Sequence, residues 1–129
     1  MRELRLLDLG LILETEEHNH DDMCSLAEMI KSMGFWTVPI AVEHSKFAIM
    51  DGHHRYNAAK KLGLKRIPCI LMDYERSGVT LQSWRPEINV SVKDVFMMIS
   101  EGKKYPHKTT RHIFQPSIDE INISLDLLY

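Results

Sequence analysis

The chain has 129 residues, of which 44% are hydrophobic and 26% are charged, and its formal net charge is −2. This length corresponds to one domain that can bury a core, and the composition is that of a globular protein rather than a disordered or fibrous one. No apolar run is long enough to span a membrane, and the charged residues among positions 1–10 exclude a signal peptide, so we expect a cytoplasmic protein. The slightly acidic balance disfavours a protein that holds duplex DNA over its whole surface.

The first half of the chain predicts a strand, a helix and two further strands. Residues 4–7 form the predicted opening strand, and a polar stretch follows at 14–22. We expect a helix at about 22–33, capped by Asp21 or Asp22 and ended by Gly34, because apolar residues recur there at helical spacing. Two strands are predicted at 38–42 and 47–50, joined by a short turn.

The second half continues the mixture of strands and helices. A helix is predicted at 53–62, followed by strands at 67–73 and 81–84, and a third helix begins after Ser91, which forms an S-x-x-D capping box with Asp94. Gly102 is expected to end that helix. We predict that the remainder is mostly irregular, with a basic segment from about 103 and a strand near 121–125. Short interleaved elements of both types predict a single α+β domain over 1–129, with a mixed sheet and about three helices.

The sharpest local feature is the run Ile49-Met50-Asp51-Gly52-His53-His54-Arg55-Tyr56-Asn57-Ala58-Ala59. Here a strand ends, a glycine allows a tight turn and a helix begins at once. The free N–H groups of a helix start favour an anion, and glycine lets the backbone approach it closely. His53, His54 and Arg55 add donor side chains, and arginine can bind phosphate oxygens in bidentate fashion. The spacing therefore predicts a phosphate-binding junction.

A plainer interpretation of the same run stays open. Asp51 can cap the helix by accepting a hydrogen bond from the N–H of His53 or His54, and the histidines can be ordinary surface residues. A single glycine does not decide between the two.

The segment from Asp51 to Tyr74, which begins D-G-H-H-R, resembles the signature of the ParB/sulfiredoxin-like superfamily, in the form that the free-serine kinases carry. The resemblance extends to residues 34–40, 79–84 and 105–112, so it covers most of the chain and implies the superfamily's compact α+β fold. It implies a nucleotide phosphate donor, ADP or ATP, together with Mg²⁺, and a small hydroxy amino acid such as L-serine as acceptor.

The resemblance also implies a catalytic glutamate shortly before the first long helix. Glu17 matches the family pattern best and Glu16 is next, and Asp51 is the expected residue for organising the turn or positioning the metal. A positioned carboxylate can accept the proton of a serine hydroxyl during transfer. Without the resemblance, Glu14, Glu16 and Glu17 would be read as a solvated acidic loop.

The tract from Glu16 to Asp22, with His18 and His20 in alternation, has the residue types of a transition-metal site. No distant His/Cys pair at the usual structural-zinc spacing completes it, so Mg²⁺ brought with the nucleotide is the favoured metal. Cys24 and Cys69 form no ligand motif and are expected to be small, partly buried apolar side chains.

Two further groups are expected near the substrate. Trp84 is a candidate wall of the substrate pocket, and Trp36 is a second candidate contact, although an aromatic residue there is more often core. In the basic segment, Thr109, Thr110 and Arg111 are suited to holding a phosphate or a carboxylate, and we expect them to fold back onto the site.

Two other functions are weighed against the kinase. A ParB-like nucleotide- or DNA-binding regulator usually carries a helix-turn-helix region after this domain, and the acidic balance disfavours specific DNA binding. A sulfiredoxin-like reductase requires a cysteine within the motif, where neither Cys24 nor Cys69 lies. The expected partners are therefore a nucleotide and a small hydroxy compound, with no membrane partner, and the oligomeric state stays open.

Overall fold

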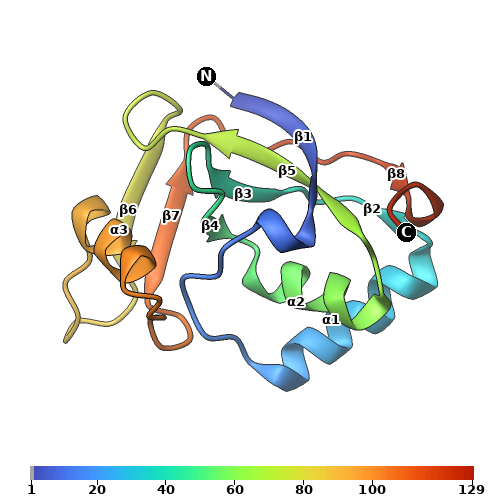
Figure 1. Ribbon diagram of the computed structural model, residues 1–129, viewed down its shortest axis with the longest axis horizontal. Helices are drawn as coiled ribbons and strands as arrows, with labels where there is room; N and C mark the ends of the chain where they lie inside the picture. Colours follow the sequence, from blue (N-terminus) through green and yellow to red (C-terminus); the bar gives the residue numbers. More distant parts are fainter. Residues whose placement is uncertain (1) are drawn as a thin grey trace.

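The computed structural model describes residues 2–129, and its centre is a four-stranded mixed sheet (Figure 1). The strands lie in the order β1 (Arg2–Asp8), β5 (Arg66–Met72), β3 (Ile40–Glu43) and β4 (Ile49–Asp51). β3 and β5 are parallel, whereas β1 and β4 run antiparallel to their neighbours. The predicted α+β class with a mixed sheet is confirmed.

Helices α1 (His20–Met33) and α2 (His53–Leu62) pack together below the sheet in Figure 1. The main core lies between them and the strands, because the helices contribute Ala27, Ile30 and Ala59 to it, and the strands contribute Ile40 and Ile67. Gly34 and Gly63 end the two helices in the left-handed conformation, as predicted.

The start of α1 corrects the sequence-based expectation. The N-cap is Asn19, whose Oδ1 accepts a hydrogen bond from the N–H of Asp22 at 2.9 Å, and Asp21 and Asp22 lie in the first turn instead of capping it. Asparagine caps as well as aspartate does, and carboxylates in the first turn interact favourably with the helix dipole. A polar stretch of this kind therefore does not reveal which residue is the cap.

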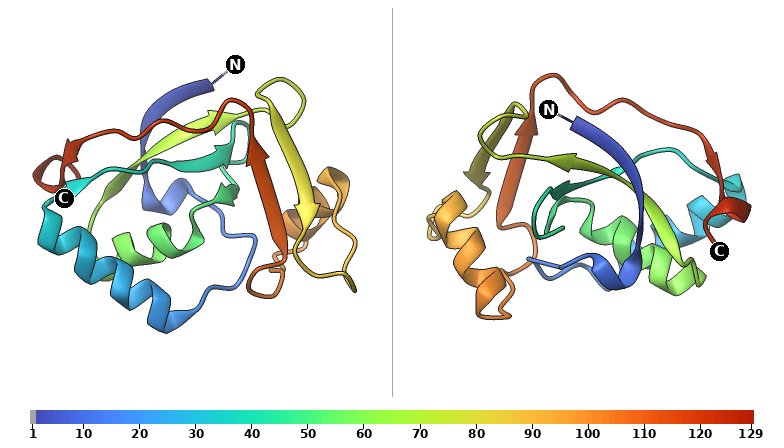
Figure 2. Two further views of the ribbon diagram at one scale, coloured as in Figure 1. Left: turned by 180° about the vertical axis from the view of Figure 1, so that it is seen from behind. Right: turned by 45° about the horizontal axis from the view of Figure 1, so that its top comes forward.

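A second antiparallel pair, β6 (Val79–Ser83) and β7 (Thr110–Phe114), lies beside the β4 end of the sheet, with helix α3 (Val92–Ser100) inserted between them in the chain (Figure 2). Val79 and Phe114 of this pair pack against a second, smaller core on the sheet. Ser91 caps α3 as predicted, and Glu101, ahead of Gly102, is the C-cap. β7 corrects the expectation of an irregular tail after residue 103. Its polar sequence is stabilised as a strand by pairing with β6, which no local pattern shows.

The remaining elements tie the chain ends to the body of the protein. β2 (Phe35–Trp36) pairs with β8 (Ile123–Ser124), and short 3₁₀ helices lie at Leu9–Leu11 and Leu125–Leu127. Cys69 is buried and Cys24 is partly buried, both as free thiols, which confirms their expected packing role. Burial raises the pKa of the Cys69 thiol to about 12. Within residues 2–129, no helix has the length and apolar character needed to cross a membrane.

Candidate active site

The junction between β4 and α2 has the geometry that the sequence predicts for an anion site. Gly52 is the N-cap of α2, with φ of 120° and ψ of 25°, and no side chain caps the helix. A Cβ atom at Gly52 would lie 2.5 Å from Ile40 Cγ2, so both the backbone angle and the packing require glycine. The alternative in which Asp51 caps the helix is not observed, and the first N–H groups of α2 remain available to a ligand.

A cleft of about 220 Å³ opens at this junction and brings together four separate parts of the chain. Its walls come from the end of β4 and the start of α2, from the loop before α1, and from the segments beside β6 and β7. The residues that line it are Glu16, Met50, Asp51, Gly52, His53, His54, Arg55, Trp84, His107, Lys108 and Thr110.

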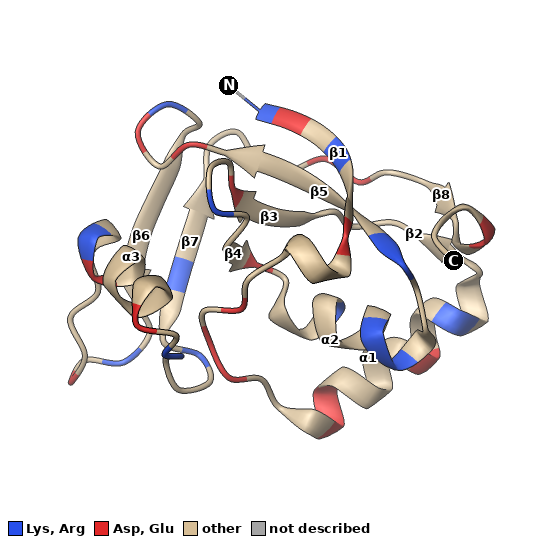
Figure 3. Cartoon of the chain, in the orientation of Figure 1, with Lys and Arg blue, Asp and Glu red and all other residues tan. Residues whose placement is uncertain are grey.

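Backbone pairing holds the two loops of the cleft together. The N–H of Tyr105 donates to Thr15 O at 2.9 Å, and the N–H of Glu17 donates to Tyr105 O at 2.8 Å, so Glu16 lies in an isolated parallel bridge with Tyr105. Figure 3 shows acidic residues on the loop before α1 and basic residues on the loop that precedes β7. Among these, Lys104 Nζ lies 3.3 Å from Glu14 Oε2.

Glu16 is the buried carboxylate of the cleft, with 8% of its surface exposed. Its Oε1 accepts hydrogen bonds from the N–H of Thr109 at 3.2 Å, the N–H of Thr110 at 2.7 Å and the Thr110 hydroxyl at 2.9 Å. These three donors fix the carboxylate, and all of them end on Oε1. Glu17, the first choice from the sequence, is exposed and does not line the cleft.

Glu14 is not among the residues that line the cleft, but it hydrogen-bonds to α2. Its Oε1 accepts a hydrogen bond from Asn57 Nδ2 at 2.7 Å, and Lys104 and Lys60 lie near Oε2. Burial raises the pKa of Glu14, but the Asn57 hydrogen bond and the two lysines outweigh it, so the pKa lies below its ordinary value. Glu14 therefore carries a charge that ties α2 to the segment before β7.

The two histidines of the motif differ in environment. His53 is buried, and its Nε2 accepts a hydrogen bond from the N–H of Thr15 at 3.1 Å. Burial lowers the pKa of His53 to about 3, so the ring is neutral and links α2 to the loop that carries Glu16. His54 is half-buried, and its Nε2 accepts from the exposed N–H of Asn19 at 3.2 Å. Burial and the neighbouring His107 lower its pKa as well.

Asp51 and Arg55 flank the glycine turn. Desolvation raises the pKa of Asp51, opposed by the positive charge of Arg55 and by the Gly52 N–H. Desolvation likewise lowers the pKa of Arg55, opposed by Asp51. The cleft thus contains a carboxylate and a guanidinium whose charges partly compensate each other.

The other residues expected at the site divide into those beside the cleft and those in the core. Trp84 lines the cleft, and the Arg111 guanidinium carbon lies 4.4 Å from its ring centroid. Trp36 is a correction: it is 1% exposed, packs in the core and donates from Nε1 to Val38 O, so it cannot touch a substrate. Thr109 is fully buried and its hydroxyl donates to Pro106 O at 2.6 Å, so it faces the fold.

His107 and Lys108 line the cleft but were not singled out by the sequence analysis, although both lie in the basic segment. Lys108 adopts a positive φ of 53°, which is unusual for a residue with a side chain. The basic composition of this segment was the feature of the sequence that pointed to it. Which of its residues face the cleft depends on the path of the backbone between Tyr105 and β7.

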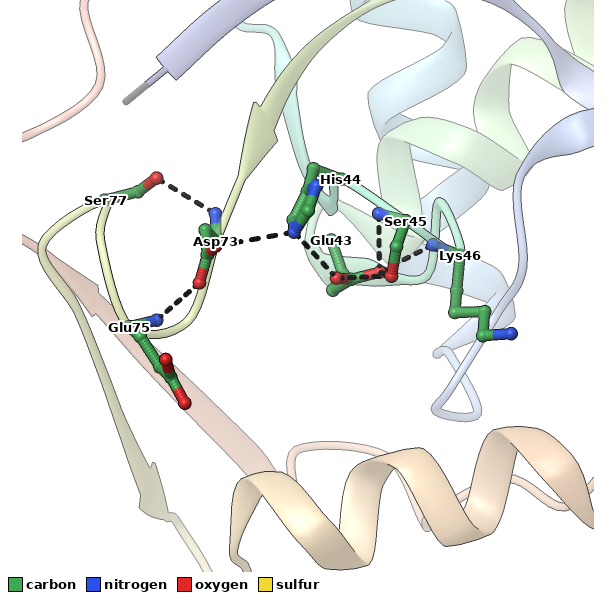
Figure 4. Close-up of polar contacts among 7 residues, drawn as sticks. All are labelled: Glu43, His44, Ser45, Lys46, Asp73, Glu75 and Ser77. Atoms are coloured by element: carbon green, nitrogen blue, oxygen red, sulfur yellow. Dashed lines mark hydrogen bonds and ion pairs between the residues drawn. The ribbon is translucent and has the colours of Figure 1, made fainter.

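A second polar region lies away from this cleft, at the turn between β3 and β4 (Figure 4). Glu43 is 4% exposed, and its Oε1 accepts hydrogen bonds from the N–H and hydroxyl of Ser45 and from the N–H of Lys46. His44 Nε2 lies 3.6 Å from Glu43 Oε2 and 3.5 Å from Asp73 Oδ2. A cavity of about 280 Å³ beside it is lined by Glu3, Arg5, His44, Leu71, Asp73 and Arg76.

Among solved structures, a free serine kinase, as a glutamate-to-glutamine mutant in complex with AMP, matches this fold with a TM-score of 0.89. The match covers 98% of this chain and 94% of that chain at 16% sequence identity. At this identity the likeness shows the shared fold alone.

Two curated relatives are similar at the level of sequence. An ATP-dependent L-serine kinase of Staphylothermus marinus is 36% identical over 103 residues, which cover 77% of this chain and 40% of the relative. An ADP-dependent L-serine kinase of Thermococcus kodakarensis is 37% identical over 93 residues, which cover 69% of this chain and 38% of the relative. The matched region thus spans about two-fifths of the length of these relatives.

The ParB N-terminal domain family matches residues 8–82, which include the glycine turn, the loop that carries Glu16 and all of α2. This match spans more than half of the chain. The sequence, the glycine-started helix and the fold therefore agree, and the chain belongs to the ParB N-terminal domain family.

Proposed function

We propose that this chain is a small-molecule kinase that transfers a phosphoryl group from ADP or ATP to the hydroxyl of free L-serine or a similar small hydroxy compound. One observation carries the proposal: a buried carboxylate, Glu16, and an uncapped helix start at Gly52 line the same cleft. The first feature suits a proton acceptor and the second suits a phosphate. The names of the two serine kinase relatives support the choice of acceptor.

The donor phosphates would lie at the start of α2. The N–H groups that follow Gly52 would donate to an anion there, and Arg55 from α2 and Lys108 from the loop before β7 would add positive charge. Arginine offers a planar fork to phosphate oxygens, and lysine acts as a point charge. Phosphoryl transfer depends mainly on such positioning and charge neutralisation.

Glu16 would be the general base, in preference to Glu17. The serine hydroxyl oxygen forms a bond to the terminal phosphorus of the donor, and the bond to the leaving nucleotide breaks. The hydroxyl proton passes to Glu16 Oε2, and AMP leaves when ADP is the donor, or ADP when ATP is. The Thr109 and Thr110 donors would hold Oε1 still during this step.

Mg²⁺ is the metal that the family resemblance implies, and the cleft offers it suitable ligands. It prefers oxygen ligands and usually keeps several waters while taking one or two carboxylates. Asp51 is the carboxylate at the glycine turn and would hold the ion together with the donor phosphates. When bound, Mg²⁺ would neutralise part of the phosphate charge.

Phosphorus NMR tests the proposal directly. The purified protein is mixed with Mg²⁺, with ADP or ATP, and with a panel of small hydroxy amino acids. We expect O-phosphoserine or a close analogue, together with AMP or ADP in equal amount. Hydrolysis of the donor without a phosphorylated acceptor, or no turnover on the whole panel, would count against the kinase.

A DNA-binding assay tests the alternative regulator. The formal net charge of −2 supports weak, salt-sensitive binding at most. A gel shift at nanomolar protein in physiological salt would instead favour the regulator.

A further inference from the structure

Three side chains from separate elements converge beside the cleft, and two of them, His54 and His107, also line it. Asp22 lies in the first turn of α1, His54 in the first turn of α2, and His107 in the loop before β7. One oxygen or nitrogen atom of each lies within 4.8 Å of the corresponding atoms of the other two. Three potential ligand atoms at this spacing can surround a single ion.

His107 supplies a second, independent observation. Its Nε2 is buried and has no hydrogen-bond partner among residues 2–129. A buried polar nitrogen without a partner is unfavourable, and in native proteins it usually indicates a water molecule or an ion at that place. The His107 ring lies edge-on to His54, with ring centroids 5.3 Å apart, so the two imidazoles of the group are in direct contact.

The donor set selects the class of ion. Two imidazoles and one carboxylate suit Zn²⁺ and neighbouring transition metals, whereas Mg²⁺ and Ca²⁺ prefer oxygen ligands throughout. A further imidazole, that of His18, lies edge-on to His54 with ring centroids 6.1 Å apart. The cluster therefore differs in chemistry from the carboxylate Asp51, at the glycine turn of the same cleft.

We propose that Asp22, His54 and His107 form a binding site for a divalent transition metal of the zinc class, separate from the Mg²⁺ of the nucleotide. Three protein ligands leave at least one coordination position for water or for a ligand in the cleft.

Cobalt titration tests the site without nucleotide or serine, so the result does not depend on the proposed kinase activity. Metal-free, untagged protein is titrated with Co²⁺, whose visible absorption reports nitrogen ligands and coordination geometry. We expect saturable binding of one ion per chain and displacement by Zn²⁺ but not by excess Mg²⁺. The absence of saturable absorption, or displacement by Mg²⁺, would overturn the proposal.

Neighbouring substitutions provide matched controls. Asp22→Asn removes one ligand at an exposed position. We expect it to weaken Co²⁺ binding by about 10- to 100-fold or more, because even residues that only hydrogen-bond to a metal ligand typically contribute that much to metal affinity. His107→Ala should do the same. Asp21→Asn and His20→Ala change adjacent residues outside the cluster and should leave the affinity at the wild-type level. Equal weakening by Asp21→Asn and Asp22→Asn would assign the binding to general acidity of the helix start.

Discussion

Glu16 and Glu43 are both buried glutamates whose Oε1 accepts two backbone N–H groups and one hydroxyl. For Glu43 the donors come from Ser45 and Lys46, two and three residues along the chain. For Glu16 they come from Thr109 and Thr110, more than ninety residues away. The same local chemistry thus closes a turn in one place and joins two distant loops in the other.

The surroundings of the two carboxylates differ. Glu16 borders a cleft that also contains an uncapped helix start, Arg55 and Lys108. The larger cavity near Glu43 is lined by charges of both signs, such as Arg5 and Asp73, and no helix start contributes to its described lining. A buried carboxylate that accepts several hydrogen bonds is therefore not by itself evidence of catalysis. The groups around it determine whether a catalytic role is plausible.

The largest difference between the two glutamates is expected when each is neutralised in turn. Glu16→Gln keeps the shape of the side chain but removes the proton acceptor, so we expect kcat to fall about 100- to 10,000-fold. Glu43→Gln should leave kcat unchanged. Steady-state kinetics by phosphorus NMR separates the two. Glu17→Gln is a further control, and a dead Glu17→Gln beside an active Glu16→Gln would reverse our choice of base.

Acid should destabilise the fold through two histidines, the buried His53 of α2 and the half-buried His112 of β7. Burial lowers the pKa of His53 from 6.5 to about 3 and that of His112 from 6.5 to about 4. The unfolded chain therefore binds more protons than the folded one below pH 6.5, and stability is lost as the pH falls from 6.5 toward those values. Each histidine should lower the free energy of unfolding by up to about 1.4 kcal/mol per pH unit.

Denaturant unfolding at pH 7 and pH 5 measures this loss. His53→Gln cannot titrate and should have a clearly shallower pH dependence than the wild type, whatever its stability at pH 7. A stability that is the same at both pH values would contradict the buried, neutral state of these rings.

A smaller effect is expected when the hydroxyl that donates to each glutamate is removed. Ser45→Ala and Thr110→Val each delete a hydrogen bond to a buried carboxylate, and each should lower the free energy of unfolding by about 1–3 kcal/mol. Only Thr110→Val should also reduce kcat, because Glu16 is the proposed base and Glu43 is not. Equal kinetics for the two variants would show that Thr110 has a structural role alone.

The smallest effect is expected at Arg111, which contacts Trp84 but does not line the cleft. A cation over an exposed aromatic ring contributes about 0.5–1 kcal/mol, so Arg111→Lys should raise KM by no more than about fivefold. The free energy of unfolding should stay within about 0.5 kcal/mol of wild type. Arg5→Lys, beside the other cavity, is the control and should leave KM unchanged. A large loss of kcat in Arg111→Lys would place the guanidinium on the transferring phosphate instead.

Much of the local structure followed from short-range patterns. Gly34 and Gly63 ended their helices as predicted, and the Asp51-Gly52 junction formed the expected turn from strand to helix. These features depend on the φ angles that glycine permits and on apolar periodicity, and both can be read within a few residues. β7 could not be predicted from such patterns, because its residues become a strand through pairing with β6.

Patterns within the sequence were enough to predict the fold class, the glycine turn from β4 into α2, and a glutamate in the loop before α1. Which glutamate faces the cleft, which tryptophan is buried, and the meeting of Asp22 with two histidines from other elements depend on the tertiary structure. Successive side chains of an extended segment point in opposite directions, so Glu16 and Glu17 are equivalent candidates until pairing with Tyr105 fixes which one turns inward. Contacts between residues far apart in the chain leave no local pattern in the sequence. The residues of the candidate site are brought together by such contacts, so the sequence alone does not reveal them.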